Sequence, residues 1–167
     1  MNAVIRAATQ ADAAPACRML CRSISECCTK DHRNDAAILA AWLGNKTPEN
    51  VAAWFACATH HSIVSCNGDE VTGVAIMTRQ GRIVLFYISP EVRSTGTGKA
   101  LLDALEAQAK EWGLRSMQVA STLSARDFYQ RHGFVDCGPA RTAFGTDAVS
   151  LTKKLPGSGG CGCSRLV

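Results

Sequence analysis

The chain has 167 residues, 47% of them hydrophobic, and a formal net charge of +4 at pH 7. This length is enough for one folded unit with a sizeable core, and the mild charge forms no basic runs of the kind that bind nucleic acid. The sequence shows neither an apolar run long enough for a membrane span nor the apolar segment of a signal peptide. We therefore expect a cytoplasmic protein without a nucleic-acid or membrane partner.

The first third of the chain is predicted to be mostly helical. A short strand over Val4–Ala7 precedes the capping box Thr9-x-x-Asp12, which starts a helix that runs to about Ser25. Thr47-Pro48 starts another helix, because threonine caps helices well and proline fits their first position. A helix over 35–43 is predicted between these two, preceded by a polar loop over 28–34.

The middle of the chain has the alternating pattern of strands. Asn67-Gly68-Asp69-Glu70 and Gln80-Gly81 are tight-turn sequences, so they divide this region into three strands of an antiparallel meander. We predict these strands over about 60–66, 71–78 and 83–88.

Helices and strands alternate in the last third of the chain. A helix with an apolar face that includes Leu101 and Leu105 is predicted to end at Gly113, and a short helix opens at Ser124-x-x-Asp127. Strands are predicted over 117–120, around 134–137 and over 148–155. The order of elements predicts a mixed α/β fold with a central, mostly antiparallel sheet of six to seven strands and helices on both faces.

A glycine-containing loop, Arg93-Ser94-Thr95-Gly96-Thr97-Gly98-Lys99, joins the third meander strand to the next helix. Its glycines allow successive backbone N–H groups to point into one concavity, and the helix N-terminus adds a positive dipole. Arg93 and Lys99 can add positive charge. This arrangement indicates a site for an anion such as a pyrophosphate.

Two nucleotide-binding signatures do not fit this loop. The nucleotide-triphosphate loop needs a glycine five residues before Gly98 and a Ser or Thr after the lysine, where this chain has Arg93 and Ala100. The dinucleotide fingerprint needs a third glycine, and Leu101 stands there. A different phosphate-bearing cofactor is therefore indicated.

The pattern that remains, Arg/Gln-x-x-Gly-x-Gly/Ala, resembles the acyl-coenzyme A loop of the GNAT superfamily of N-acetyltransferases. A strand ending in Ser89-Pro90 precedes it, as is usual in that family, and a second family motif, Ala-x-x-Phe-Tyr followed by Gly-Phe, covers residues 125–134. The motifs lie within residues 71 to 138, and together they identify the chain as similar to small bacterial-type, single-domain members.

The resemblance implies a sheet that is splayed at the cofactor site, acetyl-CoA as co-substrate, and transfer of its acetyl group to a primary amine by direct attack. Tyr129 is the implied general acid. The implied cofactor-binding residues are Phe86, Tyr87, Ile88, Arg93, Ser94, Thr95, Gly96, Thr97, Gly98, Lys99 and Thr122. Thr122 replaces an asparagine found in many relatives, which puts its cofactor contact in doubt. The alternative is a catalytically degenerate acyl-CoA-binding or sensing module that acts through a partner.

The general base and the acceptor stay open at this stage. The strand before the loop lacks the glutamate that many relatives carry, so the base is one of several candidates: His60, His61, Asp31, His32, Tyr87 or a water molecule. In relatives the acceptor pocket is formed by the first helices and the last hairpin, and here Glu26, Asp31 and Asp35 can attract a cationic amine. We expect a small-molecule or peptide amine as acceptor, and a monomer or homodimer.

Nine cysteines are present, and their spacing shows no paired Cys-x-x-Cys knuckles. We interpret most of them as small core residues and expect no metal site. Residues 1–155 are predicted to form the acetyltransferase domain. Residues 156–167 are predicted to form a flexible Gly/Ser/Cys-rich tail, in which Cys161 and Cys163 are open to metal binding or redox coupling.

Overall fold

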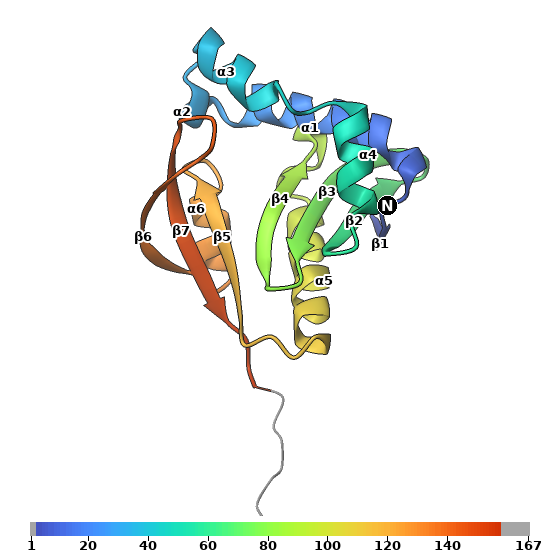
Figure 1. Cartoon of the computed structure of the whole chain (residues 1–167), viewed down its shortest axis with the longest axis vertical. Coiled ribbons are helices and arrows are strands. Elements are labelled where there is room, and N and C mark those ends of the chain that lie inside the picture. Colours follow the sequence, from blue (N-terminus) through green and yellow to red (C-terminus); the bar gives the residue numbers. More distant parts are fainter. Residues whose placement is uncertain (1–2, 158–167) are drawn as a thin grey trace, which may run out of the picture.

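The structure, a computed structural model, describes residues 3–157. Within this range seven strands form one sheet in the order β1-β2-β3-β4-β5-β7-β6 (Figure 1). Neighbouring strands are antiparallel except β4 and β5, which are parallel, so the predicted mixed sheet is confirmed. The strands are β1 (Val4–Ala7), β2 (His60–Asn67), β3 (Glu70–Thr78), β4 (Arg82–Ile88), β5 (Ser116–Thr122), β6 (Val135–Arg141) and β7 (Asp147–Lys154).

The helices follow the predicted order with one correction. They are α1 (Ala13–Cys27), α2 (Thr29–His32), α3 (Ala36–Leu43), α4 (Pro48–Ala56), α5 (Thr97–Glu111) and α6 (Arg126–Arg131), with 3-10 turns at Gln10–Asp12 and Pro90–Val92. The prediction of a polar loop over 28–34 is wrong, because α2 forms there and buries Asp31 and His32. The two side chains can be buried because each forms hydrogen bonds within the protein. The run of polar residues in the sequence does not reveal these partners.

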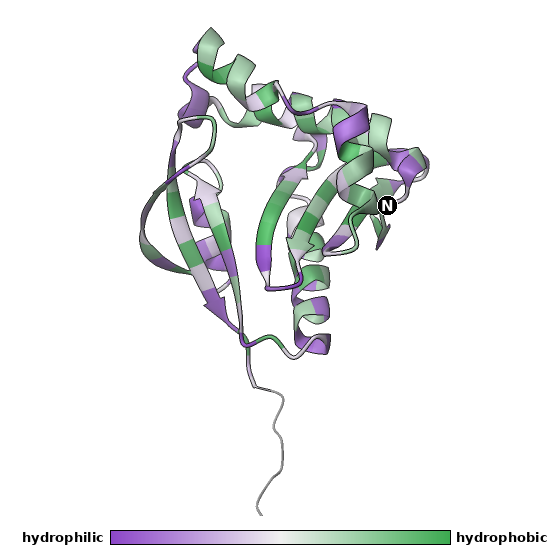
Figure 2. Cartoon of the chain, in the orientation of Figure 1, coloured by the Kyte–Doolittle hydropathy of each residue, from purple (hydrophilic) through white to green (hydrophobic). Residues whose placement is uncertain are grey.

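Each face of the sheet packs against its own helices. On one face, α1, α3 and α4 enclose a core that includes Val64, Val74 and Ile76. On the other face, α5 and α6 cover Ala75 and Met77, the neighbours of those residues along β3. This alternation is the period-two pattern that predicted the strands. Figure 2 shows that β4 is hydrophobic over most of its length, as expected for a strand covered on both faces.

β4 and β5 pair over a short stretch and then separate. The only register pairs between them are Arg82 with Gln118 and Ile83 with Val119, in the described part of the chain. Beyond these pairs β4 stays with β3, whereas β5 follows β7, which Figure 1 shows as two diverging halves of the sheet. The splayed sheet that the sequence resemblance implied is therefore present.

A β-bulge on β4 accounts for this separation. In the pairing with β3, Ile83 lies opposite Met77 and Leu85 lies opposite Ile76, so Val84 is an extra residue on β4. A bulge bends its strand and increases the local twist. Because the pairing with β5 ends at Ile83, the bend at Val84 coincides with the point where β4 turns away from β5.

The described cysteines differ in their exposure to solvent. In the described part of the chain Cys17, Cys28 and Cys66 are buried, Cys137 is exposed, and the other three are intermediate. The tail cysteines, Cys161 and Cys163, lie outside the described residues, as does most of the predicted tail.

Within residues 3–157 no group of three or more His, Cys, Asp or Glu side chains is suited to hold a metal ion. No helix in that range is both long and apolar enough to cross a membrane.

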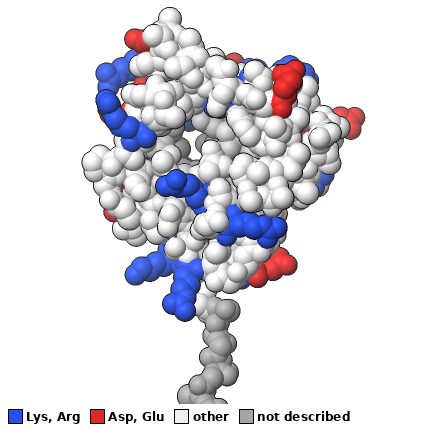
Figure 3. Space-filling model, viewed as in Figure 1, with Lys and Arg blue, Asp and Glu red and all other residues white. Residues whose placement is uncertain are grey.

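Charged side chains are distributed over the surface. On the face shown in Figure 3, Lys and Arg occupy several separate places, and Asp and Glu lie mostly toward the rim. Two aspartates in the described residues are instead buried, Asp12 and Asp31. Each of them is expected to need specific partners, because an isolated buried charge is costly.

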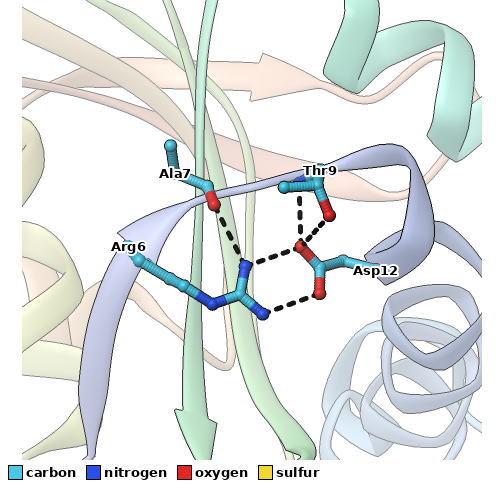
Figure 4. Close-up of polar contacts among 4 residues, drawn as sticks. All are labelled: Arg6, Ala7, Thr9 and Asp12. Atoms are coloured by element: carbon cyan, nitrogen blue, oxygen red, sulfur yellow. Dashed lines mark hydrogen bonds and ion pairs between the residues drawn. The ribbon is translucent and has the colours of Figure 1, made fainter.

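Asp12 joins β1 to the start of α1 through a bidentate ion pair (Figure 4). The Arg6 guanidinium donates to both Asp12 carboxylate oxygens, at 2.7 and 2.8 Å. The backbone N–H and the hydroxyl of Thr9 donate to the same carboxylate at 2.8 and 3.0 Å. The hydrogen bonds from Arg6, opposed by burial, lower the pKa of Asp12 from 3.8 to about 2. The capping box predicted at Thr9 is therefore confirmed.

This lowered pKa predicts how stability depends on pH. The stabilisation from ionised Asp12 is complete above pH 4 or so and is lost as the pH falls through about 2. Asp12→Asn should lower the free energy of unfolding at pH 7 by about 1–2 kcal/mol and have a much smaller effect near pH 2. Urea unfolding at several pH values measures this difference.

A matched control is Asp147→Asn, which removes an exposed pair. The Arg141 and Asp147 side chains are 77% and 66% exposed and 3.9 Å apart, so their loss should change stability by less than about 0.5 kcal/mol. Equal effects of the two substitutions at pH 7 would contradict the role assigned to Asp12.

Candidate active site

A cavity of about 700 Å³ opens where β4 and β5 separate. Its walls come from β4, from the end of β5, from α6, from the glycine loop and from the C-terminal end of α1. Elements from both halves of the sheet therefore face one space. A cavity of this size is in the range of small-molecule and cofactor sites.

The glycine loop forms one end of this cavity. Arg93, Ser94, Gly96, Gly98 and Lys99 line it. Gly96 has a φ of +92° and caps the N-terminus of α5, a helix of 15 residues. The loop therefore directs the positive end of a long helix toward the cavity, which suits an anion.

The two threonines of the loop contact the loop itself. The Thr95 hydroxyl donates to the Val92 carbonyl at 2.6 Å and lies 3.0 Å from the Thr97 hydroxyl. Neither residue lines the main cavity, although both line a smaller recess of about 320 Å³ behind the loop. Five of the seven predicted loop residues therefore line the main cavity, and Thr95 and Thr97 do not.

The second loop glycine allows α6 to approach closely. A Cβ atom on Gly98 would lie 3.2 Å from the Phe128 ring, whereas a Cβ atom on Gly96 would meet nothing within 4 Å. Gly98 thus permits contact between the loop and α6, and Gly96 is required for its backbone conformation. Phe128 consequently marks the phosphate-loop end of the cavity.

The second half of β4 forms a side wall. Phe86, Tyr87 and Ile88 line the cavity. Past Ile83 the edge of β4 that faces β5 has no strand partner in the described residues. Its backbone N–H and C=O groups are therefore open to an extended ligand with amide groups, which the pantetheine arm of coenzyme A has.

Tyr129, on α6, also lines the cavity. Its ring packs edge-on against Phe86, Phe128 and Phe134 with centroid separations of 5.9, 5.3 and 5.2 Å. Burial raises the pKa of Tyr129 above its ordinary value, and the nearby Tyr87 adds to this shift. The phenol is therefore protonated throughout the physiological pH range.

Thr122 lies at the end of β5 and lines the cavity, but its hydroxyl is engaged locally. It accepts a hydrogen bond from the Ala125 backbone N–H at 3.2 Å, in the turn that leads into α6. This bond stabilises the turn in the way a Ser or Thr commonly does. If Thr122 contacts a cofactor, its hydroxyl must do so while it also accepts the hydrogen bond from the Ala125 N–H.

Three of the four histidine and carboxylate candidates for the base do not line the cavity. His60 and His61 are on β2 and do not line the cavity, and His61 packs edge-on against Trp112. His32 is completely buried, with Nε2 3.1 Å from the Ile24 carbonyl and Nδ1 accepting from the Asn34 N–H. Because both ring nitrogens of His32 are occupied, it has no site left for a substrate proton.

The fourth candidate, Asp31, connects the two halves of the molecule. Its Oδ1 accepts a hydrogen bond from the Leu123 N–H at 2.7 Å, and its Oδ2 accepts one from the Ser124 hydroxyl. The side chain thus links α2 to the turn between β5 and α6. Residues more than 90 positions apart are joined, so no local pattern in the sequence indicates this contact.

Tyr87, the last protein candidate for the base, does line the cavity. Its hydroxyl oxygen accepts a hydrogen bond from the Trp42 indole N–H at 3.2 Å, and Trp42 stacks on Phe144 with centroids 4.3 Å apart. Burial raises the pKa of Tyr87 above its ordinary value. It is therefore a poor base at neutral pH, although it lies in the correct region.

Sequence reasoning did not assign several residues that line the cavity. Ser23, Cys27 and Cys28 come from α1 and its C-terminal cap, and Arg131 and His132 come from the end of α6. Arg131 and His132 lie inside the second family motif, which could have indicated them. Only the fold brings the α1 residues to this position, because their helical pattern is that of core packing.

A comparison with known protein families identifies the family of this chain. Residues 28–155 match the model of the acetyltransferase (GNAT) domain. The chain belongs to the GNAT acetyltransferase family. This membership is what the two sequence motifs predicted.

Relatives of this GNAT acetyltransferase agree with its fold. The chain resembles the structure of a GCN5-related N-acetyltransferase of Rhodopseudomonas palustris, with a TM-score of 0.84 and 20% identity. The match covers 93% of this chain and 97% of that one. The PaiA N-acetyltransferase of Thermoplasma acidophilum, in complex with coenzyme A, gives a TM-score of 0.76 at 15% identity over 93% of this chain and 100% of that one.

A similarity in sequence alone is more local. A mycothiol acetyltransferase of Corynebacterium aurimucosum is 35% identical over 68 residues, which are 41% of this chain and 22% of that enzyme. The chain therefore matches about a fifth of the length of this relative, and the rest of that enzyme has no counterpart in the alignment.

The hydrogen bonds of Asp31 predict unequal effects of two substitutions. Asp31→Ala leaves the Leu123 N–H and the Ser124 hydroxyl without their acceptor and should lower the free energy of unfolding by about 2–4 kcal/mol. Asp31→Asn keeps one amide oxygen as an acceptor and should cost about half as much or less. Urea unfolding gives both values, and faster exchange of the Leu123 amide proton in Asp31→Ala locates the change.

The same pair tests whether Asp31 is the base. Asn cannot accept a proton, so a catalytic base at this position would lose its activity in Asp31→Asn. We expect this variant to retain most of its turnover, which would assign Asp31 to the structure of the site.

Proposed function

We propose that this GNAT acetyltransferase transfers the acetyl group of acetyl-CoA to a primary amine of a small molecule or peptide by direct attack. One observation carries the proposal: the cavity between β4 and β5 is lined both by a glycine loop at the N-terminus of α5 and by a buried, protonated tyrosine. Acetyl-CoA, when bound, supplies the acetyl group as a thioester.

The chain offers suitable partners for each part of the cofactor. The backbone N–H groups of the loop and the α5 N-terminus suit the pyrophosphate, with Arg93 and Lys99 adding charge. Gly96 leaves open space above the loop, since an added Cβ would meet no atom within 4 Å. The related structure from Thermoplasma acidophilum, which contains coenzyme A, supports this fit.

The free edge of β4 would bind the rest of the cofactor. Backbone groups of Phe86, Tyr87 and Ile88 would pair with the two amides of the pantetheine arm, as an added strand pairs with a sheet edge. A backbone N–H near Ile88 would then donate to the carbonyl oxygen of the thioester. Such a donor stabilises the negative charge that develops there during attack.

Tyr129 would give its proton to the sulfur as the C–S bond breaks. In water a phenol, with a pKa of about 10, is a weaker acid than a thiol, with a pKa of about 8.5. In the cavity burial raises the pKa of both kinds of group, above its ordinary value for Tyr129 and to about 12 for the Cys28 thiol on the wall. A thiolate released into the same surroundings is therefore also strongly basic and can take the proton of Tyr129.

Removal of the Tyr129 hydroxyl tests the general acid. Tyr129→Phe keeps the buried ring and should lower kcat about 100-fold or more with little change in the dissociation constant of coenzyme A. Thiol release with an amine acceptor gives kcat, and calorimetry gives the dissociation constant.

The other tyrosine of the chain, Tyr87, provides the matched control. Tyr87→Phe also removes one phenolic hydroxyl from the cavity wall, but it costs only the hydrogen bond from Trp42. If both variants lose the same fraction of kcat, Tyr129 has no special role as acid.

Substitution of a loop glycine tests the phosphate site. Gly96→Val introduces a β-branched residue at a φ of +92°, so the loop must change its conformation. The affinity for coenzyme A should fall at least tenfold, about 1.4 kcal/mol, as measured by calorimetry.

Gly68→Val is the control, because Gly68 has a φ of +57° in the β2–β3 turn and is likewise free of neighbours within 4 Å. It introduces similar backbone strain at a residue that does not line the cavity. An unchanged affinity in Gly96→Val, or an equal loss in Gly68→Val, would refute the proposed loop site.

A further inference from the structure

Two cysteines on α1, one helical turn apart, form a dithiol outside the active-site cavity. We infer that Cys17 and Cys21 are a binding site for a soft monovalent metal ion, Cu(I), which their two sulfur atoms hold between them. Neither residue lines the cavity, so the site is separate from the proposed acetyl transfer. Its ligands, their spacing and the charges around them all favour this ion.

The two thiols converge on one point. The Cys17 thiol donates to the Lys46 backbone carbonyl at 3.2 Å, and the Cys21 thiol donates to the same oxygen at 3.8 Å. The two thiols also interact with each other. They therefore face one place between α1 and the loop over 44–47 that joins α3 to α4.

The burial of the pair provides an entry path for an ion. Cys17 is buried in the core under α1, whereas Cys21 is half-buried and packs against the edge of that core. An ion from solvent can therefore bind first to Cys21 and then gain Cys17 as its second ligand. Once bound to both, it is largely shielded from water.

The spacing of the pair suits a bridging ion better than a disulfide. Residues four apart on an α-helix have Cβ atoms about 5–6 Å apart. A disulfide needs a Cβ separation of about 3.5–4.5 Å, so Cys17 and Cys21 cannot form one unless that turn of α1 unwinds. A metal ion between the sulfur atoms spans the larger distance. The same spacing on a helix places two ligands on one metal ion in the His-Glu-x-x-His motif.

The number of ligands selects the kind of ion. Within residues 3–157 no third His, Cys, Asp or Glu side chain joins the two thiols in a metal-binding group. A structural Zn²⁺ site uses four such ligands, so the pair is incomplete for zinc. Thiolates select soft ions such as Cu(I), and Cu(I) forms stable complexes with only two sulfur atoms.

The charges near the pair favour a monovalent ion. Two thiolates with one monovalent ion carry one negative charge, which a single ammonium group balances. Lys46 provides this group: burial lowers its pKa, the two thiols raise it, and its Nζ lies over the uncharged Trp54 ring. Glu49 and Arg18 are exposed and act on Cys17 with opposite signs. A divalent ion would leave the Lys46 charge without a counter-charge in a partly buried place, which is costly.

Binding exchanges protons for the metal ion without any redox change. Each thiol loses its proton as its sulfur bonds to Cu(I), so one ion replaces two protons and no electron is transferred. The thiol hydrogen bonds to the Lys46 carbonyl are lost in the same step. Because the sulfur atoms stay on adjacent turns of α1, the helix keeps its form.

The test measures the affinity of the full-length chain for Cu(I) under anaerobic, reducing conditions. Bicinchoninate, a coloured chelator, competes with the protein for the ion. The reference protein carries Cys161→Ser and Cys163→Ser, so that copper bound to the tail thiols does not enter the comparison. Calorimetry with coenzyme A shows that each variant is folded.

Two pairs of substitutions are compared in this reference protein. Cys17→Ser/Cys21→Ser removes the proposed ligands, and Cys57→Ser/Cys137→Ser removes two other thiols as a matched control. The reference and the control should each bind one Cu(I) tightly. Loss of the proposed ligands should weaken this binding by more than about 100-fold, since changes to residues that only support metal ligands already cost about 10–100-fold.

A single substitution covers the case in which loss of buried Cys17 disturbs the fold. Cys21→Ser changes only the half-buried residue, yet it removes one of the two ligands, so the same loss of affinity is expected. X-ray absorption at the copper edge should show two sulfur neighbours in the reference protein. Zn²⁺ at equal concentration should not displace the Cu(I).

Several results would overturn this site. An unchanged Cu(I) affinity in Cys21→Ser, or an equal loss in the Cys57→Ser/Cys137→Ser control, would show that the ion binds elsewhere. Three or more sulfur neighbours, or displacement by Zn²⁺, would contradict the two-ligand geometry. Rapid formation of a Cys17–Cys21 disulfide with oxidised glutathione, in a protein that still binds coenzyme A, would contradict the argument from spacing.

Discussion

The separation of β4 from β5 is the constraint on which the site depends. β4 is paired with β3 along most of its length, but with β5 through two residues only, because the bulge at Val84 turns the strand. Continuous pairing would leave neither a cavity nor a free backbone edge between the two strands. The separation also leaves the sheet weakly joined at its centre, and other contacts compensate for this. Asp31 bridges α2 to the start of α6, and the stacking of Trp42 on Phe144 brings α3 against the β6–β7 turn.

The interior of the cavity favours protonated groups. Burial raises the pKa of Tyr87, Tyr129 and Cys28, and the nearby carboxylate of Asp31 is fully hydrogen-bonded. Burial keeps a tyrosine protonated and makes a thiolate in the same surroundings a stronger base, for the same physical reason. A histidine base is harder to maintain there, since its protonation creates a charge in a place with little solvent. The lining of the cavity thus suits proton donation by the proposed acid, Tyr129.

Much of the fold could be predicted because its signals are local. The capping box at Thr9, the tight turns and the alternation of strand residues each involve only a few neighbouring positions, and the glycine loop and the motif around Tyr129 are likewise short. The cap predicted at Ser124 is wrong, because α6 follows Ala125 without a side-chain cap and the Ser124 hydroxyl donates to Asp31 instead. The burial of Asp31 and His32 could not be predicted in this way. Asp31 bonds to a turn that begins 92 residues later in the sequence, and His32 bonds to carbonyl groups of the preceding helix. A run of polar residues in a sequence looks the same whether or not such partners exist. For the same reason the sequence suggested Asp31 as a base or as a site for cations, whereas its contacts give it a structural role. Thr95 and Thr97 show a similar limit, because the loop pattern does not reveal which side chains turn inward.

The order of the strands has a consequence for biosynthesis. β5 forms one wall of the cavity, yet its main neighbour is β7, which ends at Lys154 and lies between β5 and β6 in the sheet. During translation β1 to β4 can pair as soon as they emerge from the ribosome, whereas β5 must wait for more than twenty further residues before its neighbour is made. The half that contributes the glycine loop can therefore assemble first, and the half that contributes Tyr129 is completed only after β7 has been synthesised. A nascent chain stopped before β7 would expose β5 as an unprotected edge, open to pairing with other chains.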